Sequence, residues 1–126
     1  MVKKEIKTLM IEPGKHPVVT VLNDDLDSLQ KAVSIGADYQ GLIELVGLED
    51  GVDILCNEEG KLIGLEGNRR LGRDILVGVF YILSEDEDGN LVSLSEEKIK
   101  HYTEHFWQPE RFSQDEIDAC LTCHFL

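Results

Sequence analysis

Leu55-Cys56-Asn57-Glu58-Glu59-Gly60-Lys61-Leu62-Ile63-Gly64-Leu65 is the stretch with the densest turn chemistry in the chain. Apolar runs at 52–56 and 61–65 flank a short polar break, a pattern typical of a β-hairpin. Gly60 can adopt a positive φ without a Cβ clash, so we expect it to close the turn or form a bulge. Asn57 can bond the backbone of the loop through its side chain. The stretch therefore predicts a central hairpin with a polar tip.

The sequence on either side of this stretch predicts further strands. Apolar, β-branched runs occur at 6–11, 18–22, 39–46 and 75–83. The first two flank a Pro-Gly break and predict an N-terminal hairpin. The run at 75–83 is the longest, and it predicts a central strand covered on both faces.

Helix signals fall in three places. Asn23-Asp24-Asp25 opens a segment with apolar residues spaced by three and four, which Gly36 ends. Serine-to-glutamate capping boxes at 93–96 and 113–116 predict two more helices, the first reaching about Trp107. The predicted fold class is α+β, with a mostly antiparallel sheet built from hairpins, one helix after the first hairpin and two C-terminal helices.

Length and composition define the class of protein. A chain of 126 residues, 42% of them hydrophobic, is expected to form one domain with a real core. The sequence contains neither an apolar run of the roughly 20 residues needed to cross a bilayer nor a recognisable signal peptide. We therefore expect a cytoplasmic protein with no membrane partner.

The net charge of −13 argues against direct nucleic-acid binding, which needs a cationic surface. The charge is uneven: residues 23–60 hold ten acids against Lys31 alone, a net of −9, whereas residues 61–74 have a net of +2. The acidic block suggests one hypothesis, a decoy that mimics phosphates and occupies a DNA-binding host protein. The local cations suggest another, an anion-binding surface.

Polar residues around the predicted hairpin are the candidate binding site. If they converge, they form one polar surface displayed by a rigid sheet, which is where binding sites tend to lie. The structural alternative is that they build the turn and its solvated tip. The candidates are Asn57, Glu58, Glu59, Lys61, Asn68 and Arg69.

The end of the chain has the haem-attachment spacing C-x-x-C-H in Cys120-Leu121-Thr122-Cys123-His124. Haem attachment normally requires an export route, for which no signal is present, and only two residues follow the histidine. Zinc is the alternative, with the two thiolates completed by Cys56, His101 or His105. The structural reading has the cysteines packing or ending the final helix, and we expect no metal or cofactor.

Several blocks of the chain resemble one family, the uncharacterised domain-of-unknown-function 3846 family. The resemblance covers about residues 6–107, and a C-terminal helical extension at about 108–126 lies outside it. It implies a small bacterial, phage or mobile-element protein without an assigned activity, so no catalytic residue is carried over. The matching blocks are Ile11–Lys15, Leu29–Val33, Cys56-Asn57-Glu58-Glu59-Gly60-Lys61, Gly64-Leu65, Asn68-Arg69, Asp74-Ile75, Gly78–Phe80 and Ser93–Ser95.

Three functions follow as hypotheses. The first is a non-enzymatic binding or regulatory module that uses the Asn57–Arg69 region against a protein or a small anionic ligand, with arginine contacting carboxylate or phosphate. The second is the acidic decoy. The third is a small enzyme, for which the chain has no recognised catalytic motif.

Overall fold

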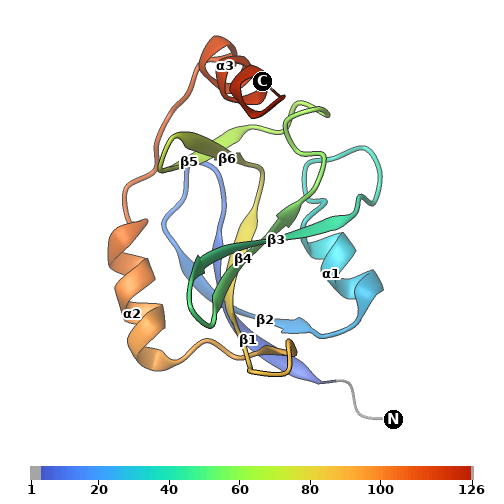
Figure 1. Ribbon diagram of the computed structural model, residues 1–126, viewed down its shortest axis with the longest axis vertical. Helices are drawn as coiled ribbons and strands as arrows, with labels where there is room; N and C mark the ends of the chain where they lie inside the picture. The colour runs from blue at the N-terminus through green and yellow to red at the C-terminus, as the bar shows by residue number, and fades with distance from the viewer. Residues whose placement is uncertain (1–3, 126) are drawn as a thin grey trace.

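The computed structural model describes the backbone of residues 4–125 and the side chains of residues 4–120. It is an α+β fold whose main sheet has six strands and is antiparallel, in the order β2-β1-β7-β4-β3, with β8 pairing onto β7 (Figure 1). The predicted fold class is confirmed. The strands of this sheet are β1 Glu5–Ile11, β2 Val18–Asn23, β3 Ile43–Glu49, β4 Val52–Asn57, β7 Phe80–Glu85 and β8 Leu91–Val92.

A second, two-stranded sheet and three helices surround the first sheet. The small sheet is the hairpin of β5 and β6, and Figure 1 shows α3 lying across it at the top of the molecule, with α2 and α1 on opposite sides of the main sheet. The additional elements are β5 Gly67–Leu71, β6 Asp74–Val77, α1 Leu26–Ala32, α2 Glu96–His105 and α3 Gln114–Phe125.

Alternation along the central strands builds a core on each face of the sheet, because successive side chains of a strand point to opposite faces. Ile54 and Ile82 pack toward α2 with Phe106, whereas Leu55 and Tyr81 belong to the cluster that includes Val33 after α1. Each helix therefore covers one face. A third, smaller cluster joins the β5–β6 hairpin to Ile117 of α3, Leu65 and neighbouring residues.

Helix caps explain where the helices begin. Asp25 caps α1 by accepting a hydrogen bond from the Ser28 N–H at 2.8 Å. Ser113 and Glu116 form the predicted reciprocal box before α3, with both backbone-to-side-chain bonds at 3.1 Å. The box predicted at 93–96 is wrong, because Ser95 is the cap of α2.

The predicted central hairpin is also wrong. Residues 58–64 form turns, and the segment 61–65 that was expected to pair with β4 is not a strand. Both sides of β4 are already occupied, by β3 on one side and β7 on the other. Gly60 does not have a positive φ; Gly64 has one instead, at +76°.

The long apolar run at 75–83 is two strands rather than one. Gly78 breaks it with a φ of +69°, so that β6 pairs with β5 while β7 enters the main sheet. A Cβ at this position would lie 2.7 Å from the Leu65 Cδ1 atom, which makes glycine the residue that fits. The predicted strand at 39–46 begins later, at Ile43.

Candidate functional site: an acidic cleft at the end of β4

A cleft of about 390 Å³ opens where β4 ends, between the turn segment that follows it and strand β6. The β6 side supplies Ile75, Leu76 and Val77, which are buried. Leu62 lies on the opposite side and is 65% exposed. The remaining members of the lining are Glu44, Cys56, Asn57, Glu58, Glu59, Gly60, Lys61 and Asp74.

Asn57 shapes the turn that forms the wall of this cleft. Its Oδ1 accepts a hydrogen bond from the Glu59 N–H at 2.9 Å, which bends the chain as an Asx turn. Its Nδ2 donates to the Val33 carbonyl at 3.3 Å, which ties the turn to the end of α1. Asn57 is itself buried. Its side chain therefore holds the wall in place rather than facing a ligand.

Gly60 allows the turn segment to approach β6 closely. A Cβ at this position would lie 2.8 Å from the Val77 Cγ2 atom, so a larger residue would push the wall outward. The glycine is thus required by packing and not by its φ angle. The sequence indicated that Gly60 is structural, and the structure gives the physical reason.

The cleft has a negative charge. Glu44, Glu58, Glu59 and Asp74 contribute carboxylates, and Lys61 is already bonded to Asp74 by an ion pair. Because Lys61 pairs with Asp74, the carboxylates of Glu44, Glu58 and Glu59 have no cation of the lining paired with them. A site of this kind attracts cations more strongly than anions.

Tyr39 extends the wall with an aromatic side chain. Its hydroxyl donates to a Glu59 carboxylate oxygen at 2.9 Å, and this hydrogen bond raises the pKa of the tyrosine. The Glu58 N–H donates to the Leu42 carbonyl at 3.0 Å, so the α1–β3 loop lies directly beside the turn. Tyr39 and Leu42 are each more than half exposed. The α1–β3 loop therefore adds exposed apolar surface beside the turn that carries Glu58 and Glu59.

Cys56 lies at the back of the cleft, where its thiol is kept protonated. Burial, together with the nearby Glu44 charge, raises the pKa of Cys56 to about 12. A thiol with such a pKa is a poor nucleophile at neutral pH. Cys56 therefore contributes apolar lining rather than chemistry.

Asn68 and Arg69 do not share this surface. Both are buried, with 0% and 1% of their area exposed, and neither lines the cleft. The expectation that all six candidates form one exposed surface is therefore wrong for these two. The cleft brings together Asn57, Glu58, Glu59 and Lys61, and their role in binding remains a prediction.

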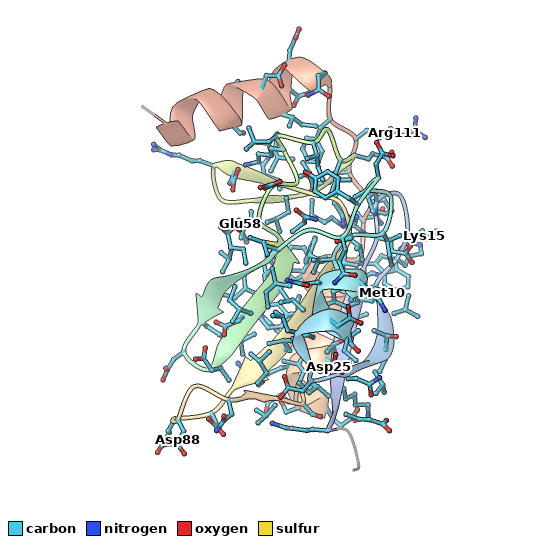
Figure 2. All side chains as sticks on the ribbon, turned by 90° about the vertical axis from the view of Figure 1, so that its right-hand side faces the viewer. Met10, Lys15, Asp25, Glu58, Asp88 and Arg111 are labelled. Carbon is cyan, nitrogen blue, oxygen red and sulfur yellow. The ribbon has the colours of Figure 1, made fainter. Side chains whose placement is uncertain are left out.

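Arg69 instead connects three segments inside the protein. Its Nε donates to the Phe106 carbonyl at 3.0 Å and its NH2 group to the Lys15 carbonyl at 2.6 Å. Its NH1 group donates to the Asn68 Oδ1 at 2.8 Å. Burial lowers the pKa of this guanidinium. Figure 2 shows Lys15, to which Arg69 bonds, on the opposite side of the molecule from Glu58.

Asn68 completes the internal network around Arg69. Its Nδ2 donates to the Ile11 carbonyl at 2.9 Å and to the Gly78 carbonyl at 2.7 Å. It therefore joins β1 to the bend between β6 and β7, in a place where buried backbone carbonyls need partners. Together, Asn68 and Arg69 form what we call the carbonyl hub, two adjacent buried residues whose side chains donate to the carbonyls of Ile11, Lys15, Gly78 and Phe106.

The described cysteine and histidine candidates do not gather into a metal centre. Among the side chains of residues 4–120, no three His, Cys, Asp or Glu groups gather as a metal site. The Cys120 thiol donates to the Arg73 carbonyl at 3.5 Å. The rings of His101 and His105 face one another, with centroids 6.4 Å apart. Cys123 and His124 lie outside the residues whose side chains the structure describes.

The sequence did not single out two acids of the cleft. Glu44 is opposite Cys56 in the β3–β4 register, and Asp74 begins β6. The signal for Glu44 is the tight Glu49-Asp50-Gly51 turn, which returns β3 along β4 and places the two strands side by side. The position of Asp74 depends on tertiary packing alone.

The fold and the cleft define a small α+β protein with an acidic pocket at the open end of an antiparallel sheet. The family model Domain of unknown function (DUF3846) matches residues 6–107, and the chain belongs to this family. Comparison with curated proteins and with solved structures gave no match. Among the described residues, none of the helices has the length and apolar character to span a membrane.

Proposed function

We propose that the protein is a non-enzymatic binding module whose acidic cleft receives a basic side chain of a partner protein. The observation that supports this most directly is the cleft lining, in which carboxylates surround an apolar wall of β6. A lysine or arginine side chain has the same two-part character, with an apolar stem and a charged end. The exposed Leu62 would then contact an apolar neighbour in the partner.

The hypothesis of an anionic ligand has less support, because the cationic side chains that would bind it are buried or already paired. Arg69 is buried and donates to carbonyls, and Lys61 is paired with Asp74. Arg70 lies 3.6 Å from a Glu116 carboxylate and stacks over Phe112. The partner we favour is therefore cationic, and the cleft is the place where we expect it to bind.

The two alternatives have less support. For a phosphate-mimicking decoy, the acids of residues 23–60 would have to form rows, yet Asp53 is buried in β4 and Glu49 is bonded to Lys98 and Tyr102. For an enzyme, an acid–base pair would be needed in the cleft. Among the described side chains no histidine lines it, and the Cys56 thiol is protonated at neutral pH.

A positional-scanning peptide library tests the proposal. We expect the full chain to retain peptides in which lysine or arginine is followed or preceded by an apolar residue. Neutralising the rim in the Glu58→Gln/Glu59→Gln variant should weaken the binding of such a peptide about tenfold, since rim charges chiefly steer and orient a ligand.

The matched control is Glu87→Gln/Asp88→Asn, which removes the same charge from the β7–β8 turn. Figure 2 shows Asp88 near the lower end of the molecule, well apart from Glu58. This control should bind like the unmodified chain. Selected peptides with no enrichment in lysine or arginine, or equal loss of binding in both double variants, would contradict the proposed function.

A further inference from the structure

The two edges of the main sheet are built differently. β3, at one edge, contains Glu44, Gly47 and Glu49, and its register with β4 is interrupted between the last two of these. Charges, glycine and a bulge are the features by which proteins protect an open edge from pairing with another chain. β2, at the other edge, is the regular run Val18-Val19-Thr20-Val21-Leu22-Asn23, which has no charge and no interruption.

β2 is also the more exposed apolar strand. Val18, Val19 and Val21 are 49%, 46% and 52% exposed. Within residues 4–125, no strand pairs with the outer side of β2, so half of its backbone groups face solvent there. An edge with these properties is a template for adding a further strand.

We propose that β2 pairs antiparallel with β2 of a second copy of this chain, about a two-fold axis at Thr20. When a two-fold axis perpendicular to the sheet passes through Thr20, each residue pairs with the residue of the second copy that lies equally far from Thr20 on its other side. In this register Val19 lies beside Val21 of the second copy, and Val18 beside Leu22. Every cross-strand pair next to the axis is then apolar, and such pairs stabilise a sheet.

Charges at the strand ends support a second copy as the occupant. Lys15 precedes β2, and Asp24 and Asp25 follow it; Figure 2 shows Lys15 and Asp25 well apart along the molecule. Antiparallel pairing places Lys15 of each chain toward Asp24 and Asp25 of the other. Within its own chain Lys15 pairs with Glu12 and Asp24 pairs with Lys4, each at 3.6 Å, so contacts between copies would add to these exposed pairs. Residues 13–23 also contain no acid in a chain of net charge −13, so the paired strands themselves bring no acids together.

The dimer leaves the acidic cleft free. The cleft lies by β4 and β6, whereas β2 is at the far edge of the sheet beyond β1 and β7. One assembly would therefore present two clefts, and a partner with two basic segments would bind both more tightly than one. The dimer does not depend on the proposed function, because its test measures mass and not peptide binding.

Sedimentation velocity of the full chain in reducing buffer tests the dimer. We expect the mass to rise to twice that of the monomer as concentration increases. Val19→Glu/Val21→Glu should weaken self-association more than about tenfold, because the new acids face each other across the axis. Position 21 lies opposite Lys7 and position 19 opposite the buried Leu9, so a thermal melt of the variant verifies that the monomer is still folded.

Leu45→Glu on β3 is the matched control, because Leu45 is 43% exposed on the other edge. It should not change the dimer. Thr20→Cys provides an independent measurement: antiparallel partners have Cα atoms about 4.5–5.5 Å apart, within reach of a disulfide. Oxidation should link two chains of Thr20→Cys and not of Leu45→Cys. A monomer at millimolar concentration, or equal effects at both edges, would overturn the proposal.

Discussion

Two polar groups that are close in sequence have opposite places in this protein. Glu58 and Glu59 lie on the wall of an open cleft, whereas Asn68 and Arg69 are buried and form the carbonyl hub. Both groups are flanked by glycine, and by composition both look like exposed loops. The two groups differ in what their side chains contact. The side chains of Asn68 and Arg69 donate to backbone carbonyls inside the protein, whereas those of Glu58 and Glu59 line an open cleft.

This comparison shows why charge alone does not identify a binding residue. A guanidinium has five N–H donors, so it can be buried where several carbonyls converge. The hub joins Ile11 and Lys15, at the end of β1 and in the turn after it, to Phe106 at the end of α2, far away in sequence. Arg69 is therefore a structural residue, and variants at this position test stability rather than binding.

Arg69→Ala should have the largest effect. The substitution removes donors to Phe106 and Lys15 and leaves a cavity, so we expect a loss of about 3–5 kcal/mol in the free energy of unfolding. Urea denaturation measures it. The control Arg70→Ala, at the exposed neighbouring position, removes only a surface ion pair with Glu116 and a ring contact with Phe112, so it should lose about 1 kcal/mol or less. Equal effects at the two positions would mean that the hub does not hold these segments together.

Gly78→Ala should have the next largest effect, because the hub depends on the bend at this glycine. The new Cβ meets Leu65 at 2.7 Å and the φ of +69° is unfavourable for alanine. We expect a loss of about 2–3 kcal/mol. Gly14→Ala is a precise control: its φ is +74° with no atom within 4 Å, so it should lose only about 1 kcal/mol. Thermal melts of both variants separate strain from crowding, and identical losses would exclude a packing role for Gly78.

The sequence predicted the sheet and helices because periodicity and capping are local signals. The alternation at Ile54-Leu55 and at Tyr81-Ile82 follows directly from the two-residue period of a strand. Strand pairing is not local. The segment 61–65 was expected to pair with β4, but β3 and β7 occupy the two sides of that strand. The break at Gly78 was visible as a glycine within an apolar run, which signals a close backbone approach.

The site was predicted in part for a similar reason. The Asx turn of Asn57 follows from residue type and could be predicted. Gly60 was expected to have a positive φ, whereas its actual role is a close approach to Val77, a tertiary contact that no local pattern encodes. Whether Asn68 and Arg69 face solvent depends on Lys15, Phe106 and Ile11, and no local pattern encodes those contacts.

Asn57→Ala tests the boundary between the two regions, because Asn57 borders the cleft but is buried like the hub. The substitution leaves the Val33 carbonyl and the Glu59 N–H without their partner, so we expect a loss of about 1–2 kcal/mol by urea denaturation. Asn90→Ala, in the exposed β7–β8 turn, is the control and should be nearly neutral. If Asn57→Ala leaves the free energy of unfolding unchanged, the Asn57 side chain does not hold the turn in place.

Asp53 is a buried acid and contrasts with Arg69, the buried base whose N–H groups are bonded to carbonyls. Asp53 is buried in β4 with its Oδ2 unbonded, and its hydrogen bond with Glu85 raises the pKa of Glu85 above its usual value of 4.5. The folded state thus binds more protons than the unfolded state just above pH 4.5. Protonation of Glu85 therefore contributes to the free energy of unfolding at low pH, and this contribution is lost as pH rises through the raised pKa. Glu85→Gln should remove this pH dependence when stability is measured at several pH values. An unchanged pH profile would show that the two carboxyls do not interact.

Glu58→Gln/Glu59→Gln should have the smallest effect on stability, and this result would sharpen the comparison most. Glu58 is exposed, and the Tyr39 hydroxyl can bond to a glutamine oxygen at position 59 as it does to the carboxylate. We therefore expect a change within about 0.5 kcal/mol by urea denaturation. A fold that tolerates the loss of both charges has no structural need for them, so the roughly tenfold fall in peptide affinity expected of the same variant would be due to the cleft itself. A large destabilisation would instead place these acids with Asn68 and Arg69, among the residues that hold the fold together.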